Sequence, residues 1–129
     1  MTMEITNQTQ WPQKIFLSLF EAAQDAPMIG SSRHAAGLVY KNKLICIGTG
    51  RTKTHPMMKE FSQSDKKITL HAEIDCIIKG INISGEDLSS YNLYSLRISK
   101  GKNVSLAKPC QICQKAIDAF GIRETYWSC

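Results

Sequence analysis

Two short segments of this sequence hold residue types that bind a metal ion and move protons. One is the tripeptide His-Ala-Glu at 71–73, and the other is Pro-Cys-Gln-Ile-Cys at 109–113. Imidazole and thiolate groups are common zinc ligands in proteins. Cysteines three positions apart on a helix share a face, so Cys110 and Cys113 can reach one metal ion. Together with His71, they form a candidate metal site.

These three residues would leave the fourth position of a tetrahedral zinc ion for water. An open position of this kind distinguishes a catalytic zinc from a closed structural one, and the bound water can ionise near neutral pH. At the start of a helix, the dipole favours the thiolate form of Cys110 and Cys113. The residue types and their spacing are therefore consistent with Zn²⁺ as a catalytic cofactor.

Glu73 is the candidate catalytic acid and base. It follows His71 by two residues, so on a helix its side chain points well away from the imidazole direction. This direction places the carboxylate beside the metal-bound water more readily than on the metal. We expect Glu73 to transfer protons during the reaction, and its loss to abolish turnover while zinc stays bound.

The hydrophobic pattern predicts the elements that position these residues. Apolar residues at helical spacing predict a first helix from Pro12 to about Gln24. Two apolar runs, Ala35–Tyr40 and Leu44–Ile47, flank a short polar turn and predict a β-hairpin. The stretch Gly48–Asp65 is rich in Gly, Thr, Pro, Lys and Ser, so we expect a long, mostly irregular loop. Long loops in compact domains are usually functional.

Both metal-binding segments are expected to begin helices. The helix after His71 is predicted over Ala72–Lys79, followed by Gly80, a residue type at which helices end. The other helix is predicted over Cys110–Phe120, followed by Gly121. The candidate ligands would therefore lie at two helix N-termini.

Two further apolar segments, Asn92–Ile98 and Ile122–Trp127, are predicted to be strands. Strands that alternate with helices need crossover connections, so the sheet should be mixed, with a parallel part beside the hairpin. The fold class is α/β. With 129 residues, 43% of them hydrophobic, and no internal repeat, we expect residues 1–129 to form a single domain.

Net charge indicates the kind of partner, and cysteine content indicates the cellular compartment. Sixteen Lys and Arg residues against eleven Asp and Glu give a net charge of +5, which favours a negatively charged partner such as phosphate. Five cysteines at irregular spacing do not fit the disulfide framework of a small secreted protein. The sequence has neither a signal peptide nor a run of ~20 apolar residues. We expect a cytoplasmic protein that contacts no membrane.

At its metal-binding segments the sequence resembles the cytidine and deoxycytidylate deaminase superfamily, specifically members whose first ligand is histidine. H-x-E followed by P-C-x-x-C is the signature of these zinc deaminases. The similarity extends over roughly Ser31 to Ser128. It includes Arg-His-Ala-Ala at 33–36, Lys-Thr-His-Pro at 53–56, Leu-His-Ala-Glu-Ile-Asp at 70–75 and Ser-Leu-Ala-Lys-Pro-Cys at 105–110.

The resemblance implies a three-layer α/β/α fold with a mixed sheet, and hydrolytic removal of ammonia from a nucleobase. Glu73 would take a proton from the zinc-bound water and deliver it to the ring nitrogen and the departing ammonia. The resemblance also implies that the backbone N–H of Ala72 and the carbonyl of Lys108 read the base edge. The long loop would form one wall of the base pocket.

Three residues of that loop are further candidates for substrate binding. Arg51 and Lys53 are suited to bind phosphate. His55 could face the base or a phosphate, and an ordinary loop histidine is the alternative.

The sequence departs from the family pattern in three places. Gly50 stands where many relatives carry an Asn that contacts the sugar. The basic hairpin Ser99–Asn103 is longer than the link in many members, and either contacts phosphate or is a solvated turn. Members commonly continue with another helix and strand after residue 127, so we expect a fold shortened at its C-terminus. Another subunit would cover the exposed sheet edge in a homo-oligomer.

The favoured function is deamination of cytosine in a free nucleoside or nucleotide, a small-molecule substrate. The first alternative is a deaminase of cytosine or adenine in single-stranded DNA or RNA, because the positive charge could follow a phosphate backbone. The second is an inactive, zinc-stabilised binding module. Glu73 argues against that module because a structural site has no need of a proton shuttle, whereas a fourth protein ligand would favour it.

Overall fold

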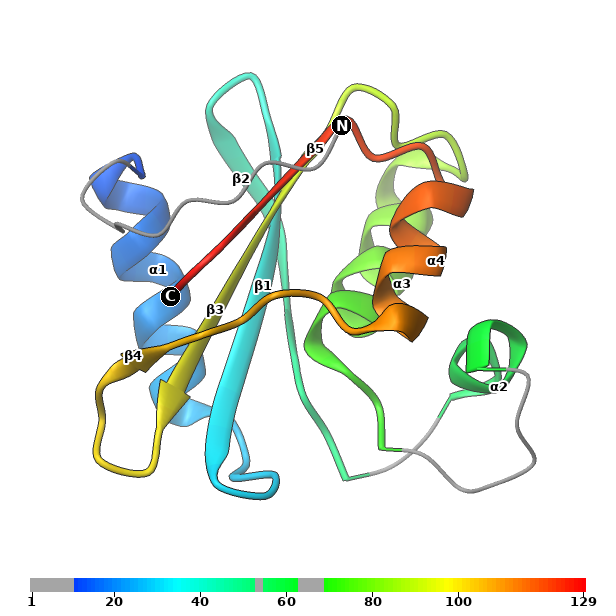
Figure 1. The fold of residues 1–129 in the computed structure, drawn as a ribbon. Helices are drawn as coiled ribbons and strands as arrows, with labels where there is room; N and C mark the ends of the chain where they lie inside the picture. The colour runs from blue at the N-terminus through cyan, green and yellow to red at the C-terminus, as the bar shows by residue number, and fades with distance from the viewer. Residues whose placement is uncertain (1–10, 53–54, 63–68) are drawn as a thin grey trace.

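The computed structural model describes residues 11–52, 55–62 and 69–129. Within these residues the chain forms a five-stranded sheet flanked by helices (Figure 1). The strands are β1 (Ser32–Tyr40), β2 (Lys43–Thr49), β3 (Asn92–Ser99), β4 (Val104–Ser105) and β5 (Glu124–Trp127). The helices are α1 (Gln13–Asp25), α2 (Pro56–Ser62), α3 (Ala72–Ser84) and α4 (Gln111–Ala119). None of these helices is long and apolar enough to cross a membrane.

The sheet is mixed, as the sequence predicts. Strand β1 lies between β2 and β3 and is antiparallel to both. Strand β5 runs parallel to the first half of β3. The short strand β4 pairs antiparallel with the second half of β3. Helix α4 belongs to the crossover that connects the parallel strands β3 and β5.

Helices cover both faces of the sheet, which confirms the predicted three-layer α/β/α arrangement (Figure 1). Helix α1 packs on one face, where Ile15 and Leu19 meet Val39 and Leu96 in one apolar core. Helices α3 and α4 pack on the other face with α2 beside α4, and their apolar residues form a second core. Side chains alternate between these cores along β1 and β3.

Two glycines let α3 lie close to the sheet. A Cβ atom on Gly48 of β2 would lie 2.2 Å from the backbone nitrogen of Cys76 in α3. A Cβ atom on Gly80 of α3 would lie 2.4 Å from Cδ1 of Leu38 in β1. Since the first contact is with backbone, a side chain at Gly48 cannot fit unless the helix moves. Gly48 therefore fixes how closely the N-terminal half of α3 approaches β2.

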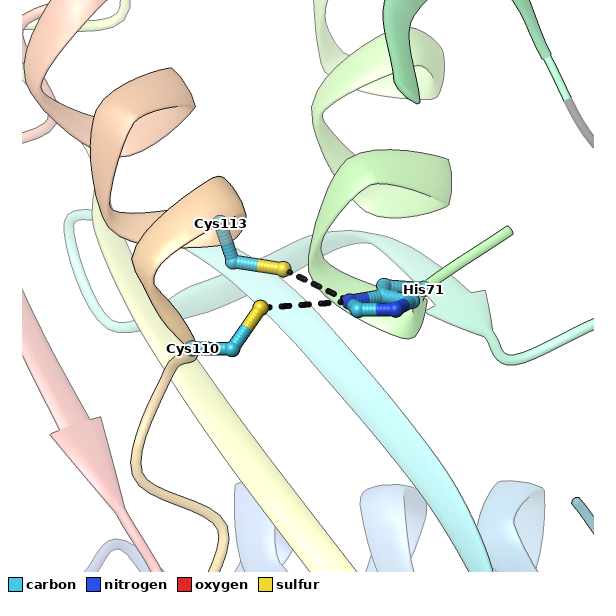
Figure 2. Close-up of side chains that lie close together, drawn as sticks. All are labelled: His71, Cys110 and Cys113. Atoms are coloured by element: carbon cyan, nitrogen blue, oxygen red, sulfur yellow. Dashed lines mark hydrogen bonds between the residues drawn. The ribbon is translucent and has the colours of Figure 1, made fainter. Parts of the chain in front are cut away.

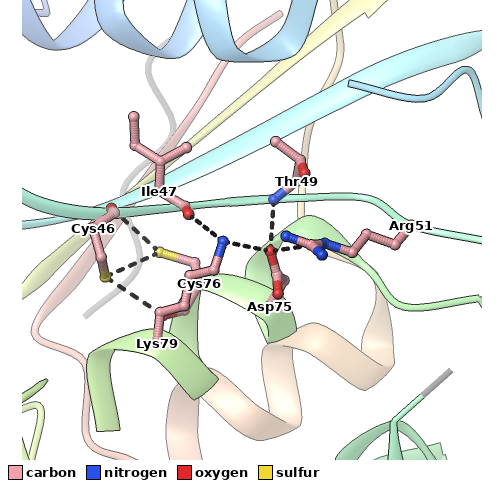
Figure 3. Close-up of polar contacts among 7 residues, drawn as sticks. All are labelled: Cys46, Ile47, Thr49, Arg51, Asp75, Cys76 and Lys79. Atoms are coloured by element: carbon pink, nitrogen blue, oxygen red, sulfur yellow. Dashed lines mark hydrogen bonds and ion pairs between the residues drawn. The ribbon is translucent and has the colours of Figure 1, made fainter. Parts of the chain in front are cut away.

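A buried carboxylate, Asp75, ties α3 to the end of β2 (Figure 3). Its Oδ2 atom accepts a hydrogen bond from the backbone nitrogen of Thr49 at 3.0 Å. The same oxygen lies 3.2 Å from Nζ of Lys79 and 3.7 Å from Nε of Arg51. Lys79 also donates to the carbonyl of Ile47 at 3.0 Å. A buried charge needs partners of this kind, so the network fixes the helix against the strand.

The helix predicted over Ala72–Lys79 is longer than the sequence analysis indicates. It continues to Ser84 and ends at Gly85, whose φ of 84° suits glycine. Gly80 lies inside the helix because it serves close packing against β1 rather than termination.

The prediction that Gly48–Asp65 is mostly irregular is wrong for its described part. Residues Pro56–Ser62 form α2, with Pro56 at the first helical position that proline favours. The hairpin turn is also shorter than predicted, because Lys43 already pairs with Tyr40.

Replacing Gly48 with alanine should destabilise the fold by about 1–3 kcal/mol, the usual cost of inserting atoms into a packed interior. Gly101→Ala is the matched control, because a Cβ atom there meets only the Asn103 side chain, at 3.6 Å. The control should change stability by less than about 0.5 kcal/mol. Urea unfolding of both variants measures the difference, and equal stability of Gly48→Ala and wild type would contradict the packing argument.

Candidate active site

Three side chains that can bind a metal ion meet where α3 and α4 begin (Figure 2). Nδ1 of His71 lies 3.3 Å from Sγ of Cys113 and 3.4 Å from Sγ of Cys110. The three ligand atoms all lie within 4.8 Å of one another. Tetrahedral bonds of about 2.0 Å to nitrogen and about 2.3 Å to sulfur would separate these atoms by about 3.5 Å. The group therefore has the dimensions of a zinc site.

The local backbone explains why these residues converge. His71 and Cys110 both occupy the N-cap position, with extended backbone before α3 and α4 respectively. Cys113 is the third residue of α4, within its first turn, and is buried. The two helices contact each other, so residues 39 positions apart in the sequence share one site. Both helix N-termini direct partial positive charge toward it.

The two cysteines are prepared differently for metal binding. The hydrogen bond from Cys113, followed by that from His71, lowers the pKa of Cys110 to about 3. The Cys110–Cys113 hydrogen bond, together with burial, raises the pKa of Cys113. The hydrogen bond between His71 and Cys110 raises the pKa of His71. One thiolate is thus present without a metal, and the proton on Cys113 would leave when a metal binds.

Glu73 is a buried carboxylate in the first turn of α3. Its side chain is 3% exposed, and it hydrogen-bonds to Cys113. Its Oε1 atom has no hydrogen-bond partner among the described residues, and Nδ1 of His34 lies 3.7 Å away. A buried carboxylate oxygen without a full set of partners is costly and is typical of functional sites.

A cavity of about 130 Å³ adjoins the metal-binding group. Glu73, His71 and Cys110 line one side of it. The other walls come from the segment between α1 and β1, from residues 69 and 70, and from the end of β3. The cavity brings a candidate acid–base group and candidate metal ligands together.

Two of the predicted substrate-binding residues, Ala72 and Lys108, line this cavity. Ala72 is the first residue of α3, where a backbone N–H has no partner within the helix. The ammonium group of Lys108 lies 6.0 Å from the centre of the Trp127 ring. Lys53 lies outside the described residues.

The other two predicted substrate-binding residues, Arg51 and His55, do not line the cavity. Arg51 pairs with Asp75, and its backbone exchanges two hydrogen bonds with Leu70. Nδ1 of His55 accepts a hydrogen bond from the backbone nitrogen of Met57 at 3.0 Å, which caps α2. Both side chains therefore contact neighbouring elements.

Two cavity residues, His34 and Arg97, are not predicted as site residues by the sequence analysis. They lie opposite each other on β1 and β3. Burial lowers the pKa of His34, so the imidazole is neutral near pH 7. Nε of Arg97 has no hydrogen-bond partner among the described residues. The sequence contains one signal, because Ser95 and Arg97 are polar residues on one face of a strand whose inner residues are otherwise apolar or aromatic.

Comparison with solved structures identifies the fold. The dCMP deaminase of the cyanophage S-TIM5 aligns with a TM-score of 0.55 and 19% identity, covering 90% of this chain and 83% of that chain. The cytidine deaminase of Mycobacterium tuberculosis aligns with a TM-score of 0.51 and 18% identity, covering 86% and 82%. This chain has the cytidine deaminase fold. The resemblance and fold class predicted from the sequence are therefore confirmed.

A mutant of the mycobacterial enzyme gives a TM-score of 0.50 at 18% identity, covering 86% of this chain and 83% of that chain. No protein-family model matches the sequence, and no curated protein matches it either. The cytidine deaminase fold is thus recognised from structure at low sequence identity.

The lowered pKa of Cys110 predicts an unusual pH profile for alkylation of the metal-free protein. Because that pKa is about 3, the thiolate should be present throughout pH 5–8, and the rate with iodoacetamide should change little. A peptide thiol with a pKa of about 8.5 should instead slow about tenfold for each unit of falling pH. Mass spectrometry of the labelled peptide measures this, and a tenfold decrease per unit at Cys110 would contradict the assignment.

Proposed function

We propose that this protein is a zinc-dependent hydrolase that deaminates cytosine in a free nucleoside or nucleotide. The observation that carries the proposal is the position of Glu73 beside the three-ligand group at one cavity. A carboxylate acid–base group next to an open metal position is the machinery of hydrolytic deamination. The fold shared with a dCMP deaminase and a cytidine deaminase supports the same reaction.

The donor set fits zinc. One imidazole and two thiolates suit its borderline-soft character, and the nitrogen–sulfur distances of 3.3 and 3.4 Å match tetrahedral coordination. Among the described residues no fourth His, Cys, Asp or Glu joins the group. Three protein ligands favour a catalytic site over the closed site of a structural binding module. Zinc bound there would supply Lewis acidity and lower the pKa of a water molecule toward about 7.

Glu73 moves the protons in this reaction. It takes one proton from the attacking water, whose oxygen adds to C4 of the cytosine ring. It delivers this proton to N3. It then takes the second proton, from the hydroxyl group now on C4, and delivers it to the amino nitrogen as the bond from C4 to that nitrogen breaks and ammonia leaves. The N–H of Ala72 and the carbonyl of Lys108 hold the base edge. Burial of Glu73 keeps bulk water away from these transfers.

The cavity is large enough for a single-ring base. Its volume of about 130 Å³ is close to the ~150 Å³ of a protein cavity that holds one benzene molecule. A pyrimidine has one six-membered ring, whereas the fused rings of adenine need more space. Arg97, whose Nε atom lacks a described partner, adds a positive charge that suits a nucleotide.

A second candidate function is deamination within a single-stranded nucleic acid. The observation in its favour is a second hollow of about 370 Å³, on the same end of the sheet, lined by Lys100, Lys102 and Arg33. Salt separates the two functions, because each phosphate contact with a single strand contributes about −0.7 to the slope of log affinity against log salt. A steep slope for an oligonucleotide, with weak activity on nucleotides, would favour this candidate.

Two further proposals concern the cellular location and the oligomeric state. The first rests on free thiols and the second on an open strand edge. All five cysteines are unpaired, which fits the reducing cytoplasm. Among the described strands, β5 pairs only with β3. We propose that a second copy of the chain covers the other edge of β5 in a homo-oligomer. Light scattering after size-exclusion chromatography should give a mass above that of one chain.

Replacing Glu73 with glutamine should reduce kcat by about 10²–10⁴-fold, the usual contribution of a general acid–base group. Zinc content should be unchanged, because Glu73 is not a ligand. Release of ammonia from cytidine, deoxycytidine and their monophosphates, with metal analysis, measures both quantities. Exposed Glu86 provides the control variant Glu86→Gln, which should keep wild-type activity. Full activity of Glu73→Gln would overturn the mechanism.

Loss of a ligand should remove the metal. His71→Ala and Cys110→Ser should each reduce zinc from about one ion per chain to a small fraction. Cys129→Ser, at an exposed thiol outside the group, should retain it. Elemental analysis of purified protein gives the answer, and full zinc occupancy in both ligand variants would place the metal elsewhere.

A further inference from the structure

Three polar side chains from three different elements form a row that begins at the cavity, which Glu73 and His34 line. Ser95 of β3, His34 of β1 and Glu73 of α3 follow one another in space. Oγ of Ser95 lies 2.5 Å from Nε2 of His34, and Nδ1 of His34 lies 3.7 Å from Oε1 of Glu73. His34 thus has one ring nitrogen on a buried hydroxyl and the other toward the candidate catalytic carboxylate.

The strand register brings these residues together. Ser95 lies opposite Ala36, and His34 lies opposite Arg97, so His34 and Ser95 are diagonal neighbours on one face of the sheet. That face carries α3, which places Glu73 above them. Ser95 is fully buried and the His34 side chain is only 13% exposed. Such burial restricts both side chains to this arrangement.

The chemistry of the row selects one tautomer of His34. Burial lowers the pKa of the imidazole, and a neutral imidazole has only one N–H. A proton on Nε2 would leave the lone pair of Nδ1 facing the carboxylate oxygen, which is repulsive. If the hydroxyl of Ser95 donates to Nε2, the ring proton lies on Nδ1 and faces Oε1 of Glu73. That oxygen has no other hydrogen-bond partner among the described residues.

We propose that His34, held by Ser95, is a positioning residue for Glu73, and that its Nδ1–H orients the carboxylate through Oε1. The second carboxylate oxygen then faces the attacking water. The distance of 3.7 Å should shorten when a base fills the cavity, since catalytic hydrogen bonds are often long without substrate. This role rests on the function proposed above.

The expected effect lies on kcat rather than on KM. A carboxylate free to rotate transfers protons less efficiently, and small misplacements near reacting atoms cost up to about 100-fold. His34→Leu keeps a side chain of similar size but removes the hydrogen-bond donor. His34→Asn places an amide N–H near the position of Nδ1. We expect kcat to fall about 10–100-fold in His34→Leu, with KM changed less than about threefold, and to recover at least about fivefold in His34→Asn.

Zinc content and melting temperature of both His34 variants show whether they fold alike. A kcat of His34→Leu within twofold of wild type would overturn the proposal. Equal kcat values for the Leu and Asn variants would also overturn it, because a packing role does not need a donor at the Nδ1 position.

A second measurement is independent of activity and uses the zinc-loaded protein. Long-range ¹H–¹⁵N NMR spectra distinguish the protonated ring nitrogen from the bare one in each of the three histidines. The signals missing from His34→Asn identify His34. We expect the Nδ1–H tautomer in wild type and loss of that preference in Ser95→Ala, while the exposed-site control Ser90→Ala keeps it. An Nε2–H tautomer in wild type would refute the positioning role.

These results separate the two proposals. A wild-type protein that is inactive on every cytosine and adenine substrate, with the Nδ1–H tautomer, contradicts the function but supports the orientation of His34 toward Glu73. Active wild type together with active His34→Leu contradicts the positioning role alone.

Discussion

The close approach of α3 to the sheet is the constraint on which the site depends. The backbone nitrogen of Cys76 would lie only 2.2 Å from a Cβ atom on Gly48, so the helix rests directly on the strand. The Asp75 network then fixes the helix along the strand direction through Thr49 and Lys79. With α3 held in this way, its first turn presents His71 and Glu73 over the end of the sheet, where α4 brings the two thiols.

The site combines two environments. On one side, two helix N-termini and a Cys110 thiolate, whose pKa is about 3, form a ligand group that is ready for a metal ion. On the other side, the sheet supplies a neutral His34 and Arg97, whose Nε atom has no hydrogen-bond partner among the described residues. Glu73 lies between them and contacts both through Cys113 and His34. A single carboxylate, Glu73, thus contacts both the metal-binding group and the polar residues that the sheet contributes to the cavity.

Sequence reasoning predicted the parts of the fold that depend on local patterns. The hairpin of β1 and β2, the strands β3 and β5, and the helices that begin after His71 and Cys110 follow from periodicity and turn residues. The end of α3 was misjudged because Gly80 serves packing, a purpose that local sequence does not distinguish from helix termination. Helix α2 was missed because its seven residues lie in a segment rich in turn formers. The alternation of polar and apolar residues marks Arg97 only as a polar position on β3, and the proximity of His34 to Ser95 and Arg97 depends on strand register, which local sequence does not specify.

In the proposed reaction, water replaces the amino group of a cytosine at this site. The most direct measurement is turnover of cytosine nucleosides and nucleotides in ¹⁸O-labelled water by the zinc-loaded protein, followed by mass spectrometry of the product. We expect one ¹⁸O atom in each uracil product and one ammonia released per uracil. Uracil without the label, or no uracil from any of these substrates, would contradict it.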